Sequence, residues 1–221
     1  MYLLARRILI RALLPLTWRP FARFRASRLA RFGVTEADSA WQILHALEAV
    51  DDPHLRCKIL QHALEEVHHA SEFSRVARPH APELLPRLLP PREPIFRRER
   101  GLEGLVTFAA YACVGEEDVL SQFDAYAAGI GDGEARAAFR EARFDEQGHV
   151  GLCRSLLVGL VGEARARREL RWARARRLWE AWTRLGRDIG ELSSILIFGL
   201  IYVGVGVIGW IPSRARLAGP G

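Results

Sequence analysis

The sequence predicts an all-α protein whose centre is a four-helix bundle, and three observations support this prediction. In a chain of 221 residues, of which 49% are hydrophobic, little is typical of β-strands. The pattern Glu-x-x-His occurs twice, and each copy follows another glutamate at the same distance of 30 residues. Six prolines between residues 79 and 94 separate the copies and cannot continue a helix. We therefore expect two helical hairpins joined by a long connection between the second and third helices.

Residues 1–33 form the first expected element, a basic amphipathic segment. They contain eight arginines and no acidic residue, interleaved with leucine, tryptophan and phenylalanine. This composition is typical of a helix that lies on a membrane surface. A secretory signal peptide fits poorly because Arg11 interrupts the apolar run, whereas a mitochondrial transit peptide shares the composition.

The bundle is expected over residues 34–162. Thr35 starts its first helix, with Thr35-x-x-Asp38 as a capping box. Apolar periodicity and turn signals then predict helices over about 35–50, 54–77, 102–128 and 134–160. In each hairpin the turn lies midway between the lone glutamate and the Glu-x-x-His pattern. Because residues equidistant from a turn lie at the same level, each hairpin brings its three acidic and histidine residues together.

Six residues are the candidate metal ligands, and all of them lie on core-facing stripes. Residues i and i+3 project from the same side of a helix, so a carboxylate and an imidazole at that spacing can bind one ion. Burying carboxylates is costly unless they are protonated, paired or bound to cations. A single such motif is more often a solvated acidic face, but the six together favour a metal site. These candidates are Glu36, Glu66, His69, Glu116, Glu146 and His149.

Two overlapping Glu-x-x-His patterns stand in the second helix, and periodicity chooses between them. Glu66 and His69 share a face with apolar residues such as Phe73. Glu65 and His68 share theirs with charged and polar residues. The inward pair is therefore predicted to be Glu66 and His69.

This ligand order resembles the ferritin-like di-iron carboxylate proteins, which include rubrerythrins, demethoxyubiquinone hydroxylases and alternative oxidases. The resemblance rests on the ligand pattern between about residues 35 and 160. It implies a ferritin-like four-helix bundle in which the six residues hold two iron ions, with manganese or a mixed iron and manganese pair as the alternative. The chain has no Cys-x-x-Cys pair, so it lacks the rubredoxin iron site of a rubrerythrin.

The cysteines are three in number and lack metal-binding spacing, which favours a reducing compartment. Cys113 and Cys153, together with His62, are candidates to contact the ligands from outside the centre. Buried cysteines are more often small apolar core residues, and this alternative stays open.

The C-terminal part is expected to meet a membrane. Residues 163–190 form a helix rich in arginine and tryptophan, which a nucleic-acid surface would also use. Residues 191–212 contain 20 consecutive uncharged residues, enough for a transmembrane helix, and residues 213–221 form a tail. This membrane segment favours a membrane protein over a nucleic-acid-binding one. Arginines concentrate before the span, which predicts that the bundle lies on the cytoplasmic side.

The expected function is that of a membrane-anchored di-iron oxidase or oxygenase. It would use dioxygen or peroxide to oxidise a lipophilic substrate, such as a quinone or an acyl lipid. Apolar residues at positions 105, 106, 108, 120 and 123 could line a substrate channel, and core packing explains them equally well. No dinucleotide-binding glycine motif is present, so an external electron donor is expected.

Two alternatives to this function remain open. One is a membrane ferroxidase or iron-handling protein, and the other is a non-catalytic partner-binding subunit with a structural metal site. The expected location is a bacterial inner membrane, with the mitochondrial inner membrane as the alternative, and the protein could form a homodimer.

Overall fold

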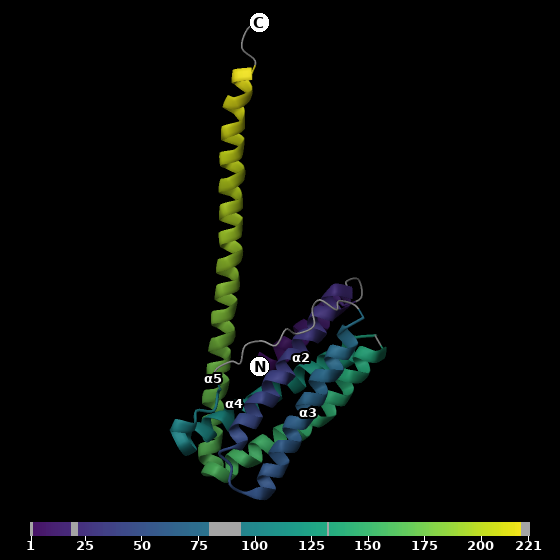
Figure 1. The fold of residues 1–221 in the computed structure, drawn as a ribbon, viewed down its shortest axis with the longest axis vertical. Coiled ribbons are helices and arrows are strands. Elements are labelled where there is room, and N and C mark those ends of the chain that lie inside the picture. The colour runs from purple at the N-terminus through teal and green to yellow at the C-terminus, as the bar shows by residue number, and fades with distance from the viewer. Residues whose placement is uncertain (1, 19–21, 80–93, 132, 218–221) are drawn as a thin grey trace. The chain divides into compact units, whose positions relative to one another are not determined.

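The computed structural model is all-helical and describes every residue except 1, 19–21, 80–93, 132 and 218–221 (Figure 1). Most side chains after Thr183 also lie outside the described set. The described residues form five α-helices and one short 3-10 helix: α1 Tyr2–Thr17, α2 Ala22–Leu47, α3 Pro53–Ala77, η2 Arg98–Arg100, α4 Gly101–Gly129 and α5 Gly133–Leu217. The chain divides into two compact units, Met1–Ala173 and Arg174–Gly221, and the first contains all six candidate ligands.

Local sequence signals set several helix ends. The Asp52 side chain accepts a hydrogen bond from the Leu55 amide at 2.6 Å, and Pro53 occupies the first turn of α3. Within α5 the helix is interrupted at Gly162, where φ is 73° and ψ is 161°. A residue with a side chain rarely adopts this positive φ, so glycine allows the break in α5 at this position.

α2 begins at Ala22, so the prediction that a helix starts at Thr35 is wrong. The Thr35 hydroxyl donates to the Arg31 carbonyl one turn earlier, at 3.0 Å, instead of capping a helix. Residues before Thr35 continue the helix because several of them, such as Leu29, have a core to pack against.

Part of the basic N-terminal segment packs onto the bundle. Leu14 and Trp18 are buried, and the Trp18 ring lies 5.6 Å from that of Tyr126 and 6.3 Å from that of Phe139. Other apolar residues of α1, including Leu9 and Leu16, are exposed. The membrane-surface role of this segment is not tested by these contacts and stays a prediction.

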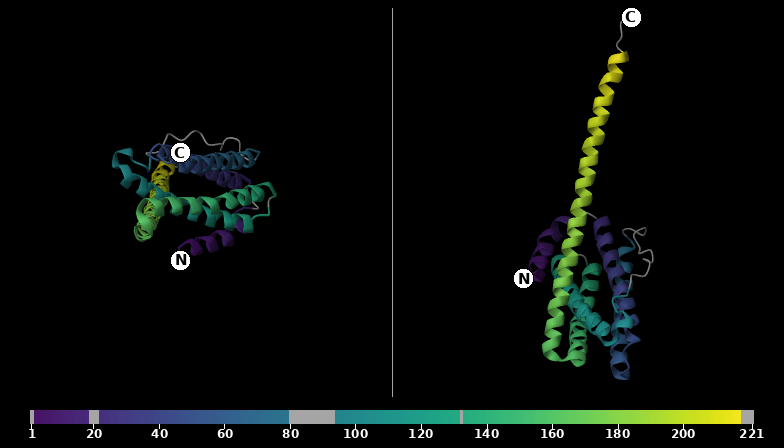
Figure 2. Two further views of the ribbon diagram at one scale, coloured as in Figure 1. Left: turned by 90° about the horizontal axis from the view of Figure 1, so that it is seen from below. Right: turned by 90° about the vertical axis from the view of Figure 1, so that its left-hand side faces the viewer.

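The helices of the bundle pair as two hairpins (Figures 1 and 2). α2 packs along α3, and the two helices approach closely at Gly33, where an added Cβ would lie 3.1 Å from the Ala70 carbonyl oxygen. Between α4 and α5, Arg143 donates to Asp124, and Arg136 donates to the Ala127 carbonyl at 3.0 Å. The long connection predicted over 79–94 lies almost entirely in residues 80–93, outside the described residues.

The apolar core consists of two clusters with a polar layer between them. One cluster contains Ile43, Ile59, Leu105, Cys113 and Leu157, among others. The other is aromatic and is built around Phe73, Phe123 and Phe139. Along each of α2, α3, α4 and α5, the chain passes from one cluster to the other through acidic and histidine residues. The polar layer is therefore enclosed by apolar side chains at both ends.

Among the described residues, no helix is sufficiently long and apolar to cross a membrane. This finding contradicts the transmembrane helix predicted over residues 191–212. The uncharged run is not a separate helix but the distal part of α5, and the described side chains that precede it include closely spaced arginines. Most side chains of 191–212 lie outside the described residues.

Candidate metal centre

All six candidate ligands lie in the buried polar layer. α2 contributes Glu36 and α4 contributes Glu116, whereas α3 and α5 each contribute a glutamate and a histidine. The side chains form two groups, and within each group the potential ligand atoms lie within 4.8 Å of one another. The first group is His62, Glu66, Glu116 and His149, and the second is Glu36, Glu66, His69 and Glu146. Glu66 belongs to both groups, so the two potential metal positions adjoin.

The inward-facing atoms of this layer lack hydrogen-bond partners among the described residues. Several lie close together, for example His149 Nδ1 at 3.2 Å from Glu66 Oε1, but they are not aligned as hydrogen bonds. Buried polar atoms are normally paired, so a group of unpaired ones needs an explanation. A metal ion bound by oxygen and nitrogen donors supplies one. The unpaired atoms are Glu36 Oε1, His62 Nε2, both oxygens of Glu66, His69 Nδ1, both oxygens of Glu146, and His149 Nδ1.

The carboxylates of the layer differ in how readily they ionise. Burial, followed by the negative charge of Glu66, raises the pKa of Glu36 well above its ordinary value. Burial and the charges of Glu116 and Glu66 do the same to the pKa of Glu146. Burial also opposes the ionised form of Glu66, but close contacts with His149 and His62 outweigh it and lower its pKa.

Two histidines of the layer, His62 and His149, have raised pKa values, which favours their positively charged form. Burial disfavours the imidazolium of His62, but contacts with Cys153, Glu116 and Glu66 outweigh it and raise its pKa to about 11. His149 behaves in the same way, with burial opposed by Glu66 and Glu65, and its pKa rises to about 8. The metal-free layer therefore holds protons at positions where a cation would otherwise provide positive charge.

Two further carboxylates orient the ligand histidines. His69 Nε2 donates to Asp145 Oδ2 at 3.0 Å, and His149 Nε2 donates to Glu65 Oε2 at 2.8 Å. Each of these histidines thereby turns its Nδ1 toward the centre. A carboxylate behind a metal-binding histidine is a recurrent arrangement, because it fixes the tautomer and strengthens the ligand.

Glu65 and Asp145 were not predicted to belong to the site. The apolar periodicity of α3 places Glu65 on the outer face with His68, but Glu65 is half-buried and contacts His149 across the bundle. His68 is exposed and lies 3.2 Å from Glu141. The signal was present in the sequence, since an acidic residue directly precedes the glutamate of each Glu-x-x-His pattern.

The three residues predicted to contact the ligands take different places. The imidazole of His62 faces the ligands directly, with Nε2 at 3.2 Å from Glu66 Oε1. Cys153 contacts His62 from outside, and burial raises the pKa of its thiol to about 11, so it is a neutral thiol. Cys113 is fully buried in the apolar core.

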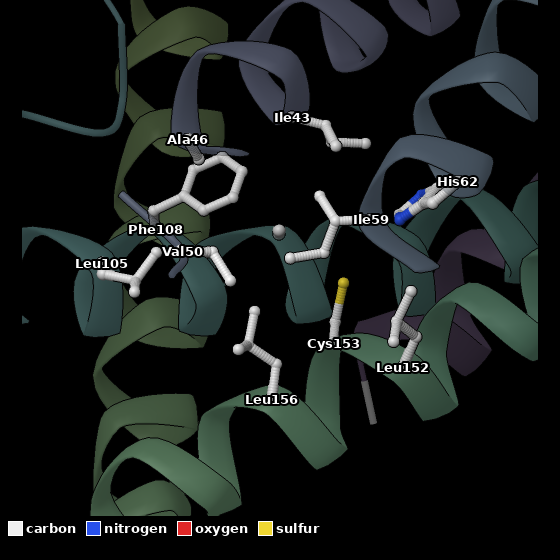
Figure 3. A pocket seen from close by; sticks show the side chains of 11 residues that line it. Ile43, Ala46, Val50, Ile59, His62, Leu105, Phe108, Leu152, Cys153 and Leu156 are labelled. Carbon is white, nitrogen blue, oxygen red and sulfur yellow. The ribbon is translucent and has the colours of Figure 1, made fainter. Parts of the chain in front are cut away.

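An apolar pocket adjoins the centre on the side of His62 (Figure 3). It is a cavity of about 20 Å³, which is about the size of one water molecule. Figure 3 shows His62 at one end and Leu105 and Phe108 at the other, with Cys153 at the wall. Of the positions predicted for a channel, Leu105 and Phe108 line this pocket. Val106 and Phe123 do not line it, and all four residues belong to the packed core.

Comparisons with known protein families, curated proteins and solved structures find no match to this chain. Buried glutamate and histidine groups of an all-helical protein could hold metal ions, and this arrangement is compatible with a di-iron site.

Proposed function

We propose that this protein is a di-iron oxidoreductase that reduces dioxygen or peroxide and oxidises an organic substrate. The observation that carries the proposal is the set of unpaired inward atoms, which belong to two ligand groups sharing Glu66. Carboxylates and imidazoles are donors that suit iron and manganese, and two adjoining groups suit two ions. When bound, two ferrous ions would supply the electrons that reduce the oxidant.

The side chains of the centre would have different roles in such chemistry. Glu66 would help to hold both ions, because it belongs to both groups. Glu65 and Asp145 hold the outer N–H groups of the two histidines, which keeps Nδ1 directed inward. The two apolar clusters exclude water from both ends of the polar layer, which strengthens electrostatic interactions within it.

The size and lining of the pocket suit a small apolar oxidant. Its volume suits a molecule of two or three atoms, such as dioxygen, and its lining is apolar apart from His62 and the Cys153 thiol. An organic substrate needs more space than this cavity provides. We propose that this substrate is lipophilic, because the side chains that enclose the centre are apolar. We also propose that the electrons come from an external donor, because the sequence contains no dinucleotide-binding motif.

Anaerobic reconstitution of the metal-free protein with ferrous iron tests the proposal. Elemental analysis should find about two irons per chain. Glu66→Ala should lose both irons because Glu66 serves both groups, whereas His68→Ala should retain them because His68 is exposed. Addition of dioxygen, a chemical reductant and a quinone or acyl lipid should then give repeated turnover at a constant iron count.

Three other outcomes would refute the proposal in different ways. A protein that binds no iron does not have this centre. Continued oxidation of added ferrous iron, with no response to quinones or acyl lipids, would indicate iron handling. Two tightly bound irons without any oxygen consumption would indicate a structural metal site.

A further inference from the structure

His62 breaks the internal symmetry of the centre. The two halves of the bundle match residue for residue at the six predicted ligands, since Glu66 and His69 correspond to Glu146 and His149. His62 precedes Glu66 by four residues, one helical turn. The corresponding position before Glu146 is Ala142, which is buried and has no ligand atom. The centre thus has one histidine without a counterpart.

The geometry of His62 is that of an inward-facing donor. Its side chain is buried, and Nε2 lies 3.2 Å from Glu66 Oε1 and 3.5 Å from Glu116 Oε1. Its ring stacks on that of His149, with 3.7 Å between the centroids. Nε2 has no aligned hydrogen bond among the described residues, as is true of the inward nitrogens of the other two histidines. Cys153, a member of the apolar core, contacts the same side chain.

The extra imidazole makes the two ligand groups chemically different. The group that contains His62 has two imidazoles and two carboxylates. The other has one imidazole, from His69, and three carboxylates. Imidazole-rich sites favour the later and softer divalent ions, and carboxylate-rich sites accept harder ions such as manganese. Two such positions cannot bind the same ion with equal affinity.

We propose that His62 is a seventh ligand that belongs to one metal position only, and that this position therefore binds ions such as cobalt or ferrous iron more tightly. The inference rests on the proposed metal centre. It adds that the centre is asymmetric and that its tighter position lies on the side of the apolar pocket, because His62 lines both.

Titration of the metal-free protein with cobalt(II) alone tests this inference. Calorimetry and visible absorption measure the binding. The wild-type protein should bind about two cobalt ions per chain in two distinguishable steps. His62→Ala should weaken the tighter step by roughly 100-fold or more and leave the weaker one close to its wild-type value, since a lost ligand costs more than the roughly 10–100-fold typical of a lost outer partner. Added imidazole should restore the tighter step in this variant.

Controls separate a ligand from a residue needed for folding. His68→Ala removes an exposed histidine of the same helix and should leave both steps unchanged. His62→Gln keeps most of the side-chain volume, and its circular dichroism should match that of the wild type, so it replaces His62→Ala if the smaller variant unfolds. Wild-type protein that binds no cobalt would refute the metal centre itself. Two unchanged steps in His62→Gln or in a folded His62→Ala would leave the centre intact and overturn the role of His62.

Discussion

Removal of the carboxylate behind a ligand histidine should weaken metal binding without removing any ligand. Glu65→Gln keeps the size of the side chain and an acceptor oxygen for His149, but it removes the negative charge. Hydrogen bonds to charged groups contribute about 1.5–3 kcal/mol when well shielded. The Glu65 side chain is 32% exposed, so solvent screens part of this interaction. We therefore expect a loss of about 1.5 kcal/mol, or roughly tenfold in metal affinity.

The same reasoning applies to the other half of the bundle. The Asp145 side chain is 27% exposed and accepts from His69 at 3.0 Å, so Asp145→Asn should cost a similar tenfold or so. The two carboxylates support different histidines on different helices. Because these histidines belong to different ligand groups, the double variant should lose about tenfold at each metal position, and the product of the two binding constants should fall roughly 100-fold.

Competition against a chelator of known affinity measures these losses. Glu141→Gln is the matched control, because Glu141 also contacts a histidine, His68, at 3.2 Å, but both side chains are more than half exposed and neither belongs to the centre. A second readout needs no metal. Loss of the Glu65 charge should lower the pKa of His149 from its value of about 8, as followed by nuclear magnetic resonance of the imidazole protons. Equal metal affinities in Glu65→Gln, Glu141→Gln and wild type would refute the reasoning.

Three further predictions concern the stability of the metal-free bundle. Gly33→Ala should lower the free energy of unfolding by about 1–3 kcal/mol, because the new Cβ would lie 3.1 Å from a backbone carbonyl of α3. Gly151→Ala is the control, because an added Cβ there would lie in open space and should not lower it. Equal melting temperatures of the two variants would contradict this prediction. Phe139→Ala should cost about 3–5 kcal/mol in urea denaturation, since its ring is fully buried among aromatic rings, and Phe144→Ala, at an exposed position, should cost little; similar losses in both would show that the aromatic cluster is not the core. The raised pKa of His149 contributes stability that is lost as the pH rises through about 8, so the melting temperature in chelator should fall between about pH 7 and about pH 9; a constant value would contradict the charge state assigned to the layer.

The ligand helices could be predicted from the sequence because their apolar stripes are long and regular. Glu66 and His69 lie on the stripe that continues into Phe73, and both are buried as that stripe requires. The start of α2 could not be predicted in this way. Thr35 and Asp38 form a capping pattern, but a pattern of four residues does not show whether the preceding residues have a core to pack against. Leu29, buried beside the aromatic cluster, shows that they do.

The roles of Glu65 and His62 depend on contacts between helices, which periodicity within one helix cannot show. Glu65 lies at the edge of the apolar stripe of α3, where its own helix would leave it in solvent. It is held at the bundle interior by His149 of α5, which is 84 residues away in the sequence. For His62 the sequence indicates only that it shares a face with Glu66. Whether its imidazole reaches the ligand atoms or stops behind them depends on how closely α3 approaches α4 and α5.

The distribution of protons explains how so polar a layer can exist between two apolar clusters. Four carboxylates buried together would repel one another strongly if all were ionised. The raised pKa values of Glu36 and Glu146 keep these two carboxyls protonated under conditions where an exposed glutamate is not, and the raised values for His62 and His149 favour imidazolium beside the ionised Glu66. Metal ions would have to displace these protons, so metal affinity must rise with pH while the stability of the metal-free bundle falls. The side chains that make this layer costly to bury without metal are therefore the same ones that could hold a metal ion.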